Sequence, residues 1–278
     1  MIKRIIRKIS DKPWKLKYTK DIQCAYSNSM ITGNSINGKK VCISGATGDI
    51  GDAMIRRFLL EGCSIILIGR SEEKLQRILN LYNKDNKIQC LKINLMDEQN
   101  IIEVYKSFLK NNDIDILINN AGIFNGIQEK KFRTVNEETL MKTLNTNLRS
   151  VEILTDLTVK KNIHTKRKLS IINISSICTQ FNSFRYSPYG ISKSGLLGLT
   201  MDLNKKYENS GIISRAIIPG SVATKMGNIS LGDNIVGNNN ILKRVAIPEE
   251  IAAIAAIYAS DIGEYCINNL IASAGEVL

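Results

Sequence analysis

From Lys40 onward, short apolar runs alternate with longer amphipathic stretches, and this alternation is the feature that most constrains the fold. The runs are too short for helices and rich in Ile, Val or Leu, which is typical of strands covered on both faces. The stretches between them carry apolar residues at three- and four-residue spacing, which indicates helices. This rhythm predicts an α/β fold: a single doubly wound parallel sheet with helices on both faces, Rossmann-like. The expected strands are 41–44, 64–68, 88–93, 114–118, 169–174 and 212–217, and the expected helices are 49–61, 72–82, 97–110, 137–161 and 188–207.

Length and composition favour one domain in a reducing compartment. The chain has 278 residues, 44% of them hydrophobic, and six scattered cysteines without a Cys-x-x-Cys pair. We find no second strand–helix series and no apolar stretch near the ~20 residues that cross a bilayer. We therefore expect a soluble, cytoplasmic protein with a basic arm over 1–38 and one domain over 39–278.

Positive charge is concentrated in the arm. The net charge is +12, of which residues 1–20 contribute +7, so the body is only mildly basic and we expect no nucleic-acid partner. The isoleucines of 2–9 have helical spacing, with Lys and Arg on the other face. This segment is interpreted as a helix that docks on its own domain or on a sister subunit, or as a peripheral membrane contact through residues 1–20. A mitochondrial presequence is a further alternative, which the abundant Lys disfavours.

The first expected strand runs directly into a glycine-rich turn, Gly45-Ala46-Thr47-Gly48-Asp49-Ile50-Gly51, called here the phosphate-binding turn. Glycines let a backbone approach a pyrophosphate, and the following helix offers N–H donors at its N-terminus. A dinucleotide site is predicted. Arg70 follows the second strand where NAD sites usually carry an acid, which favours NADP (NADPH) over NAD; the alternative is a solvated surface Arg.

Three further motifs occur in order: Asn119-Asn120-Ala121-Gly122, Ser175-Ser176, and Tyr189-x-x-x-Lys193. Tyr189 and Lys193 share one helix face, and a nearby ammonium lowers the pKa of a phenol from about 10 toward the range of general acid–base catalysis. Ser176 can hydrogen-bond a substrate oxygen that gains negative charge. Together the motifs resemble the short-chain dehydrogenase/reductase family, and their spacing resembles its 3-oxoacyl-carrier-protein-reductase-like branch, over roughly 39–278.

The resemblance implies an NADP-dependent oxidoreductase that transfers hydride between a nicotinamide and a small-molecule carbonyl or alcohol substrate. It further implies a homodimer or homotetramer. The catalytic residues would be Ser176, Tyr189 as the acid/base, Lys193, which would also bind the nicotinamide ribose, and Asn147, which would hold a relay water; Asn147 as a structural capping residue is the alternative. The expected cofactor-binding residues are Gly45, Thr47, Gly48, Asp49, Ile50, Gly51, Arg70, Asn94, Leu95, Asn120, Ala121, Gly122, Tyr189, Lys193, Pro219, Gly220, Val222 and Thr224.

One departure leaves other functions open. Asp49 stands where the family usually has glycine, and the spacing Gly45-x-x-Gly48-x-x-Gly51 is closer to the extended branch. A carboxylate beside a pyrophosphate is repulsive unless it turns away to cap the helix. The alternatives are a sugar-nucleotide epimerase or dehydratase of that branch, and a non-catalytic dinucleotide-fold scaffold tethered by its arm.

The remaining segments have no readable chemistry. The Gly- and Asn-rich segment 225–243 is interpreted as a tolerated insertion or a substrate lid, and it shares the substrate determinants with 123–136. His164, the only histidine, is expected in a solvated loop. No metal site is predicted.

Overall fold

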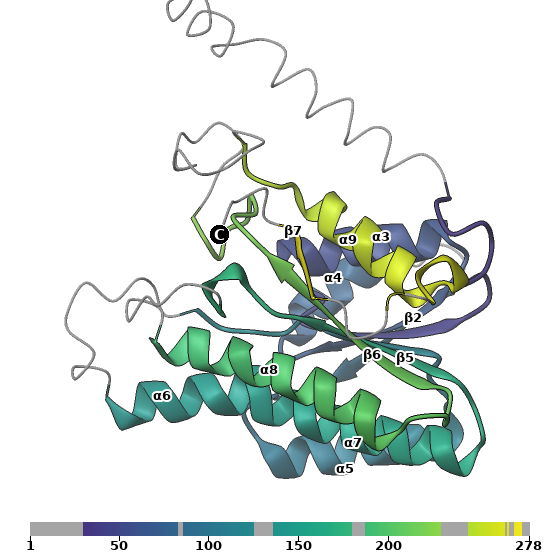
Figure 1. Ribbon diagram of the computed structural model, residues 1–278, viewed down its shortest axis with the longest axis horizontal. Helices are drawn as coiled ribbons and strands as arrows, with labels where there is room; N and C mark the ends of the chain where they lie inside the picture. Colours follow the sequence, from purple (N-terminus) through teal and green to yellow (C-terminus); the bar gives the residue numbers. More distant parts are fainter. Residues whose placement is uncertain are drawn as a thin grey trace, which may run out of the picture.

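The computed structural model describes residues 30–82, 86–124, 136–179, 187–228, 244–264, 266 and 270–273. These residues form a seven-stranded parallel sheet in the order β3-β2-β1-β4-β5-β6-β7, and helices cover both faces (Figure 1). The α/β fold expected from the sequence is therefore confirmed. The strands are β1 (Lys40–Ser44), β2 (Ser64–Gly69), β3 (Ile88–Lys92), β4 (Ile116–Asn119), β5 (Leu169–Ile174), β6 (Ile212–Pro219) and β7 (Leu270–Ser273). The helices are α3 (Asp49–Leu60), α4 (Glu72–Tyr82), α5 (Glu98–Asn111), α6 (Glu137–Leu144), α7 (Ser150–His164), α8 (Ser187–Lys206) and α9 (Pro248–Ala259).

The sheet separates two apolar cores. Successive side chains of a strand point to opposite faces, so Val41 and Ile43 of β1 pack toward α3, α4 and α9, whereas Cys42 packs toward α5 and α7. All three are fully buried. Burial on both faces explains why the strands read as continuous apolar runs rather than as alternating ones.

The helix expected over 137–161 is present, with one irregularity. A π turn, Asn145–Arg149, lies within it and joins α6 to α7. Three smaller differences are that β4 begins at Ile116 rather than at residue 114, that His164 ends α7 instead of lying in a loop, and that β7 was not predicted.

Strands β2 and β3 are added on one side of β1, and β4 to β7 are added on its other side, so the strand order switches between β1 and β4, which pair directly. In open parallel sheets this switch point opens a crevice beyond the carboxyl ends of the strands. The phosphate-binding turn leaves β1 there, and Asn120-Ala121-Gly122 leaves β4 beside it. The fold therefore brings the two predicted motifs to one edge.

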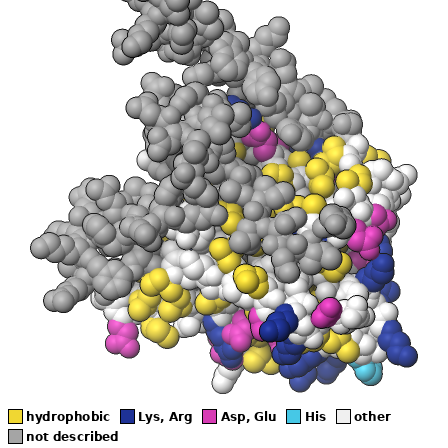
Figure 2. Space-filling model, viewed as in Figure 1, with side chains coloured by type: hydrophobic (Ala, Val, Ile, Leu, Met, Phe, Trp, Pro, Cys, Tyr) yellow, Lys and Arg dark blue, Asp and Glu magenta, His cyan; other side chains and the backbone are white. Residues whose placement is uncertain are grey.

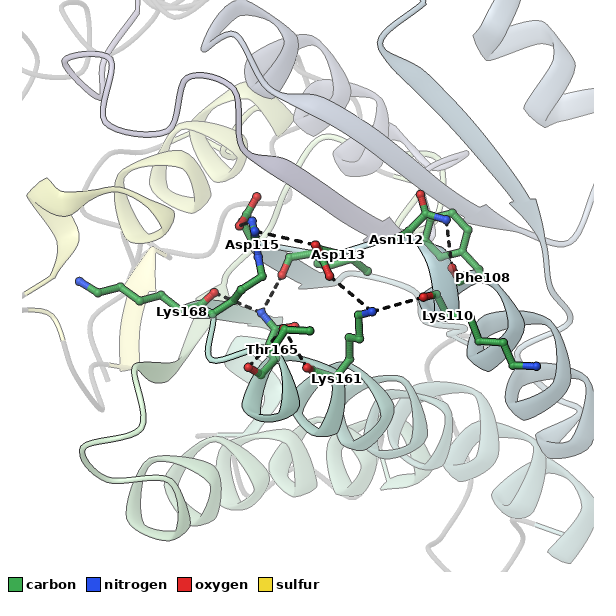
Figure 3. Close-up of polar contacts among 11 residues, drawn as sticks. Phe108, Lys110, Asn112, Asp113, Asp115, Lys161, Thr165 and Lys168 are labelled. Atoms are coloured by element: carbon green, nitrogen blue, oxygen red, sulfur yellow. Dashed lines mark hydrogen bonds and ion pairs between the residues drawn. The ribbon is translucent and has the colours of Figure 1, made fainter.

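The opposite, amino edge of the sheet is held by charged side chains. Lys and Arg side chains gather along the lower right of the molecule in Figure 2. Arg167 contacts Asp115 at 2.6 Å and Asp113 at 3.8 Å, and Lys161 lies 3.6 Å from Asp113 (Figure 3). Solvent-exposed pairs of this kind contribute little stability each, about 0–1 kcal/mol. They join the end of α7 to the segment that enters β4.

Buried Asn162 closes the same edge from inside. Its amide nitrogen donates to the carbonyl oxygens of Ile114, at 2.8 Å, and Lys168, at 3.2 Å. Both carbonyls belong to segments entering neighbouring strands, so a single side chain fixes α7 against β4 and β5. The amino edge is thus structural, and the candidate site lies at the carboxyl edge.

Residues 30–38 pack onto the domain. Buried Glu61, at the end of α3, accepts the backbone N–H and the hydroxyl of Thr32 and forms an ion pair with buried Arg57 at 3.1 Å. Ile36 is 2% exposed and belongs to the core that contains α3. The amphipathic segment 2–9 lies outside the described residues.

Candidate functional site

Two glycines shape the phosphate-binding turn. Gly45 has φ +67°, and a Cβ there would lie 2.6 Å from the Cα of Ala121. A Cβ on Gly51 would lie 2.5 Å from the carbonyl oxygen of Gly45. Gly48 differs, because a Cβ there would lie 3.6 Å from its nearest neighbour, the carbonyl oxygen of Gly45. Glycine is therefore required at the first and last positions of the turn and is optional in the middle.

The N-terminus of α3 has no side-chain cap. Gly48 is its N-cap and makes no side-chain hydrogen bond, so the first-turn N–H groups are left for an anion. The side chain of Asp49 makes a contact that the sequence did not suggest: its Oδ2 accepts the backbone N–H of Lys225 at 2.7 Å. Ile50 packs against the core beneath.

The predicted adenosine end lies along β2 and β3. Arg70 is exposed just after β2, and Thr47 lies beside the end of that strand, 3.6 Å from a Cβ placed on Gly69. Asn94 is exposed beyond β3, where its Oδ1 accepts the N–H of Met96 at 3.2 Å. Leu95 is half-buried. Because β2 and β3 pair, these residues share one wall of the crevice.

Ser44 joins the turn to the segment after β4. Its hydroxyl accepts the N–H groups of Asn120 and Ala121, both at 3.2 Å. The side-chain amide of Asn120 donates to the carbonyl of Gly45 at 3.0 Å. Sequence reasoning missed Ser44, although its place between a strand and the first glycine is a signal that could have indicated it.

Ser176, Tyr189 and Lys193 come together beyond β5. The Ser176 hydroxyl lies close enough to the phenol of Tyr189 to lower its pKa. The Nζ of Lys193 lies 5.6 Å from the centre of the Tyr189 ring and donates to the carbonyl of Ile174 at 2.8 Å. The helical spacing of tyrosine and lysine therefore places both at one point, as predicted.

Burial outweighs the effect that Lys193 was expected to have on the pKa of Tyr189. Burial raises the pKa of Tyr189 above its usual value; the Cys178 thiol adds to this rise, and the Ser176 hydroxyl opposes it. Burial lowers the pKa of the Lys193 ammonium to about 8. Desolvation penalises the charged form of each group, so at neutral pH the phenol is protonated.

Asn147 lies in the π turn and is fully buried. Its side chain accepts the N–H of Ile123 at 2.8 Å and donates to the carbonyl of Ile123 and the hydroxyl of Ser192, both at 3.0 Å. A Cβ on Gly122 would lie 3.3 Å from the Nζ of Lys193 and 3.5 Å from the Oδ1 of Asn147. The side chain of Asn147 is therefore committed to holding the segment after β4 against α8.

Three more side chains support the cluster. Ser175 donates to the carbonyl of Lys193 at 2.9 Å, so it does more than end a strand. Ser192 donates to the carbonyl of Tyr189 at 2.7 Å. The ring of Phe124 meets that of Tyr189 edge-on at 5.2 Å between centroids. Sequence reasoning did not assign Ser192 or Phe124, because nothing in the local pattern shows which way they face.

The segment after β6 forms the last wall. Pro219 ends the strand and Gly220 follows it. Buried Val222 forms a parallel bridge with Ala246, and Thr224 is half-buried. Most of 225–243 and of 123–136 lies outside the described residues.

The described part of the chain offers no other obvious chemistry. His164 is exposed, and no three His, Cys, Asp or Glu side chains gather there as a metal site. Within the same residues, no helix has the length and apolar character needed to span a membrane.

Known proteins resemble the chain over most of its length. The family model for short chain dehydrogenase matches residues 39–233. The 3-oxoacyl-[acyl-carrier-protein] reductase FabG of Rickettsia typhi is 32% identical over 82% of this chain and 92% of the relative. The corresponding reductase of Chlamydia pneumoniae is 28% identical with the same coverage. The 7alpha-hydroxysteroid dehydrogenase of Paraclostridium sordellii is 32% identical over 79% of this chain and 84% of the relative.

Solved structures agree on the fold. ElxO with NADP bound has a TM-score of 0.77 at 21% identity and covers 86% of this chain and 98% of its own. The 3-ketoacyl-(acyl-carrier-protein) reductase of Brucella melitensis, complexed with NADH, has the same TM-score and identity and covers 87% and 98%.

Proposed function

Because the chain belongs to the short-chain dehydrogenase family, whose members are oxidoreductases acting on CH–OH and carbonyl groups, we propose that it is an NADP-dependent reductase of a small carbonyl compound, or the reverse alcohol dehydrogenase. It is similar to the 3-oxoacyl-carrier-protein-reductase-like branch of the family. The observation that carries the proposal is the convergence of Ser176, Tyr189 and Lys193 at the carboxyl edge of the sheet.

The crevice fits a nicotinamide dinucleotide. The backbone of Gly45 and Gly51 leaves no room for a side chain, and the uncapped N-terminus of α3 suits a pyrophosphate. Exposed Arg70 would pair with a 2′-phosphate, which is the basis for proposing NADP over NAD. When bound, the nicotinamide supplies or accepts the hydride.

Tyr189 would act as the proton donor in reduction. The burial that raises its pKa keeps the phenol protonated, as a general acid must be before the reaction. The Ser176 hydroxyl, which lies beside that phenol, would donate to the same carbonyl oxygen as negative charge develops. The Lys193 ammonium, close to the ring, would stabilise the phenolate left after proton transfer.

Asn147 would act mainly by position. The family resemblance gives this residue a relay water, but its side chain is occupied by Ile123 and Ser192. The role that its contacts support is to hold the segment after β4 and the first turns of α8 at a fixed distance.

The two alternative functions are less well supported. The spacing that suggested an epimerase depends on Gly48, where the structure has space for a side chain. Asp49, which suggested a non-catalytic scaffold, is bonded to Lys225 and so has a structural partner. Neither observation favours a second function.

Assembly and location are also proposals. Exposed apolar side chains on α6 and α8, Met141, Ile191 and Met201, support a homodimer or homotetramer formed through these helices. Sedimentation equilibrium measures this state directly. We propose a cytoplasmic enzyme; a peripheral membrane contact through residues 1–20 predicts that deletion of the arm abolishes sedimentation with anionic liposomes.

Replacement of Tyr189 by Phe tests the catalytic proposal. The variant removes one hydroxyl and keeps the ring that packs on Phe124. We expect NADPH oxidation with a panel of carbonyl compounds, including acyl thioesters and sugars, to fall at least about 100-fold, the scale of lost general acid catalysis, while NADPH still quenches protein fluorescence. Tyr207→Phe, just beyond α8, is the matched control. Turnover that survives in Y189F rejects the mechanism.

A further inference from the structure

Asp49 links two segments that are 176 positions apart in the chain. It is the first residue of α3, and its Oδ2 accepts the backbone N–H of Lys225 at 2.7 Å. Hydrogen bonds to an ionised acceptor are among the stronger ones in proteins. Asp49 is half-buried and Lys225 is exposed, so the bond lies at the surface of the molecule.

The segment that reaches Lys225 is already fixed on its other side. Ala223 donates to the carbonyl of Ala246, and Ala246 donates to that of Ser221, both at 2.9 Å. Thr224 is the one residue between this bridge and Lys225. The contact from Asp49 therefore supplies the second anchor for Thr224.

An acid is suited to this position for a local reason. The N-terminus of α3 carries partial positive charge and has no side-chain cap, so it stabilises the carboxylate. Asp52, on the same helix, has different partners, since it bonds Arg56 at 3.1 Å and the hydroxyl of Tyr82 at 2.9 Å. Of these two acids, Asp49 alone contacts the segment after β6.

We propose that Asp49 is a positioning residue, whose carboxylate fixes the turn at Thr224 and Lys225 against the phosphate-binding turn and so preorganises two walls of the dinucleotide crevice. The inference rests on the proposed function, which assigns this crevice to NADP. Two opposing effects follow. The negative charge of Asp49 repels the phosphates of the cofactor and so weakens binding. The hydrogen bond orders the turn before the cofactor arrives, so less conformational entropy is lost on binding and the affinity rises.

Two substitutions separate the effects. Asp49→Asn removes the charge but keeps an oxygen acceptor, and Asp49→Ala removes both. Deuterium uptake by peptides containing Lys225 is measured on the full chain without cofactor, and the NADPH dissociation constant by fluorescence. Asp52→Asn is the matched control on the outer side of α3, and melting curves establish that each variant is folded.

We expect the amide of Lys225 to exchange at least about 5-fold faster in D49A than in D49N, wild type or D52N, because one hydrogen bond is lost. We expect D49A to bind NADPH about 5-fold more weakly than D49N, since the two differ in the acceptor and not in charge. Equal exchange, or equal NADPH binding by D49A and D49N, overturns the inference. Failure of the wild type to bind NADPH instead rejects the proposed function, and the exchange result then still decides whether Asp49 holds the turn.

Discussion

The Nζ of Lys193 donates to the backbone carbonyl of Ile174, 2.8 Å away, in a site where the lysine is 3% exposed. The carbonyl belongs to the last residue of β5, so this bond fixes α8 to the strand that leads to Ser176. The same burial makes the charged lysine costly, and it lowers the pKa of the ammonium to about 8.

This cost predicts how stability depends on pH. Between about pH 8 and the unfolded pKa of 10.5 the unfolded chain binds more protons at Lys193 than the folded chain, so stability rises with pH. The penalty is complete below pH 8 and fades above it. Lys193→Met has no such group, and its stability advantage over wild type should shrink by about 2 kcal/mol between pH 7 and 9.5. Urea unfolding at several pH values measures this difference, and a difference that stays constant contradicts the assignment.

Arg70 provides the test of cofactor preference. If its exposed guanidinium pairs with the 2′-phosphate, Arg70→Ala loses a charge-assisted contact of about 1.5–3 kcal/mol, or about 10- to 100-fold in NADPH affinity. NADH lacks that phosphate, so its affinity should change little. Titration of both cofactors by fluorescence makes the comparison, with Arg77→Ala on α4 as the control. Equal losses for NADPH and NADH would show that Arg70 does not read the phosphate.

The strands could be predicted because each is buried on both faces and therefore forms a continuous run of apolar residues, such as Ile171 and Ile172 in β5. The four-residue spacing of Tyr189 and Lys193 likewise survives folding, because a helix fixes it. The π turn could not be predicted, because the apolar spacing continues through it; its buried Asn147 bonds Ile123 and Ser192, both distant in sequence.

Charge and burial at the site were equally hidden. The pKa of Tyr189 depends on how deeply the phenol is buried and on where the Lys193 ammonium points, which are tertiary properties. The sequence suggests a relation between Asp49 and its own helix only, whereas its partner in the structure, Lys225, belongs to the segment after β6. Motifs therefore predict which side chains meet, while their protonation and supporting contacts require the structure.

Substitution of Glu61, which lies far from the crevice, should cause a large loss of stability. Its carboxylate is fully buried, pairs with buried Arg57 and accepts the N–H of Thr32. Glu61→Ala leaves a buried guanidinium without this partner and should lower the free energy of unfolding by about 3–5 kcal/mol. Glu152→Ala, which removes an exposed partner of Arg149, should cost at most about 1 kcal/mol. Urea denaturation compares the two, and similar losses would refute the account of residues 30–38.

The phosphate-binding turn gives the sharpest matched pair of substitutions. A methyl group on Gly51 would lie 2.5 Å from the carbonyl oxygen of Gly45, which is backbone and cannot move aside without distorting the turn. A methyl group on Gly48 would meet nothing closer than 3.6 Å. Gly51→Ala should therefore lower the melting temperature by several degrees, on the order of 1–3 kcal/mol of overpacking, and weaken NADPH binding.

Gly48→Ala should be clearly milder than Gly51→Ala, because the position has room and only the preference for glycine over alanine at the N-cap, at most about 1 kcal/mol, is lost. Thermal melting and NADPH titration of the two variants decide the point. If Gly48→Ala weakens NADPH binding as much as Gly51→Ala does, the backbone at Gly48 contacts the pyrophosphate of the cofactor. The Gly45-x-x-Gly48-x-x-Gly51 spacing would then again support the extended-branch alternative.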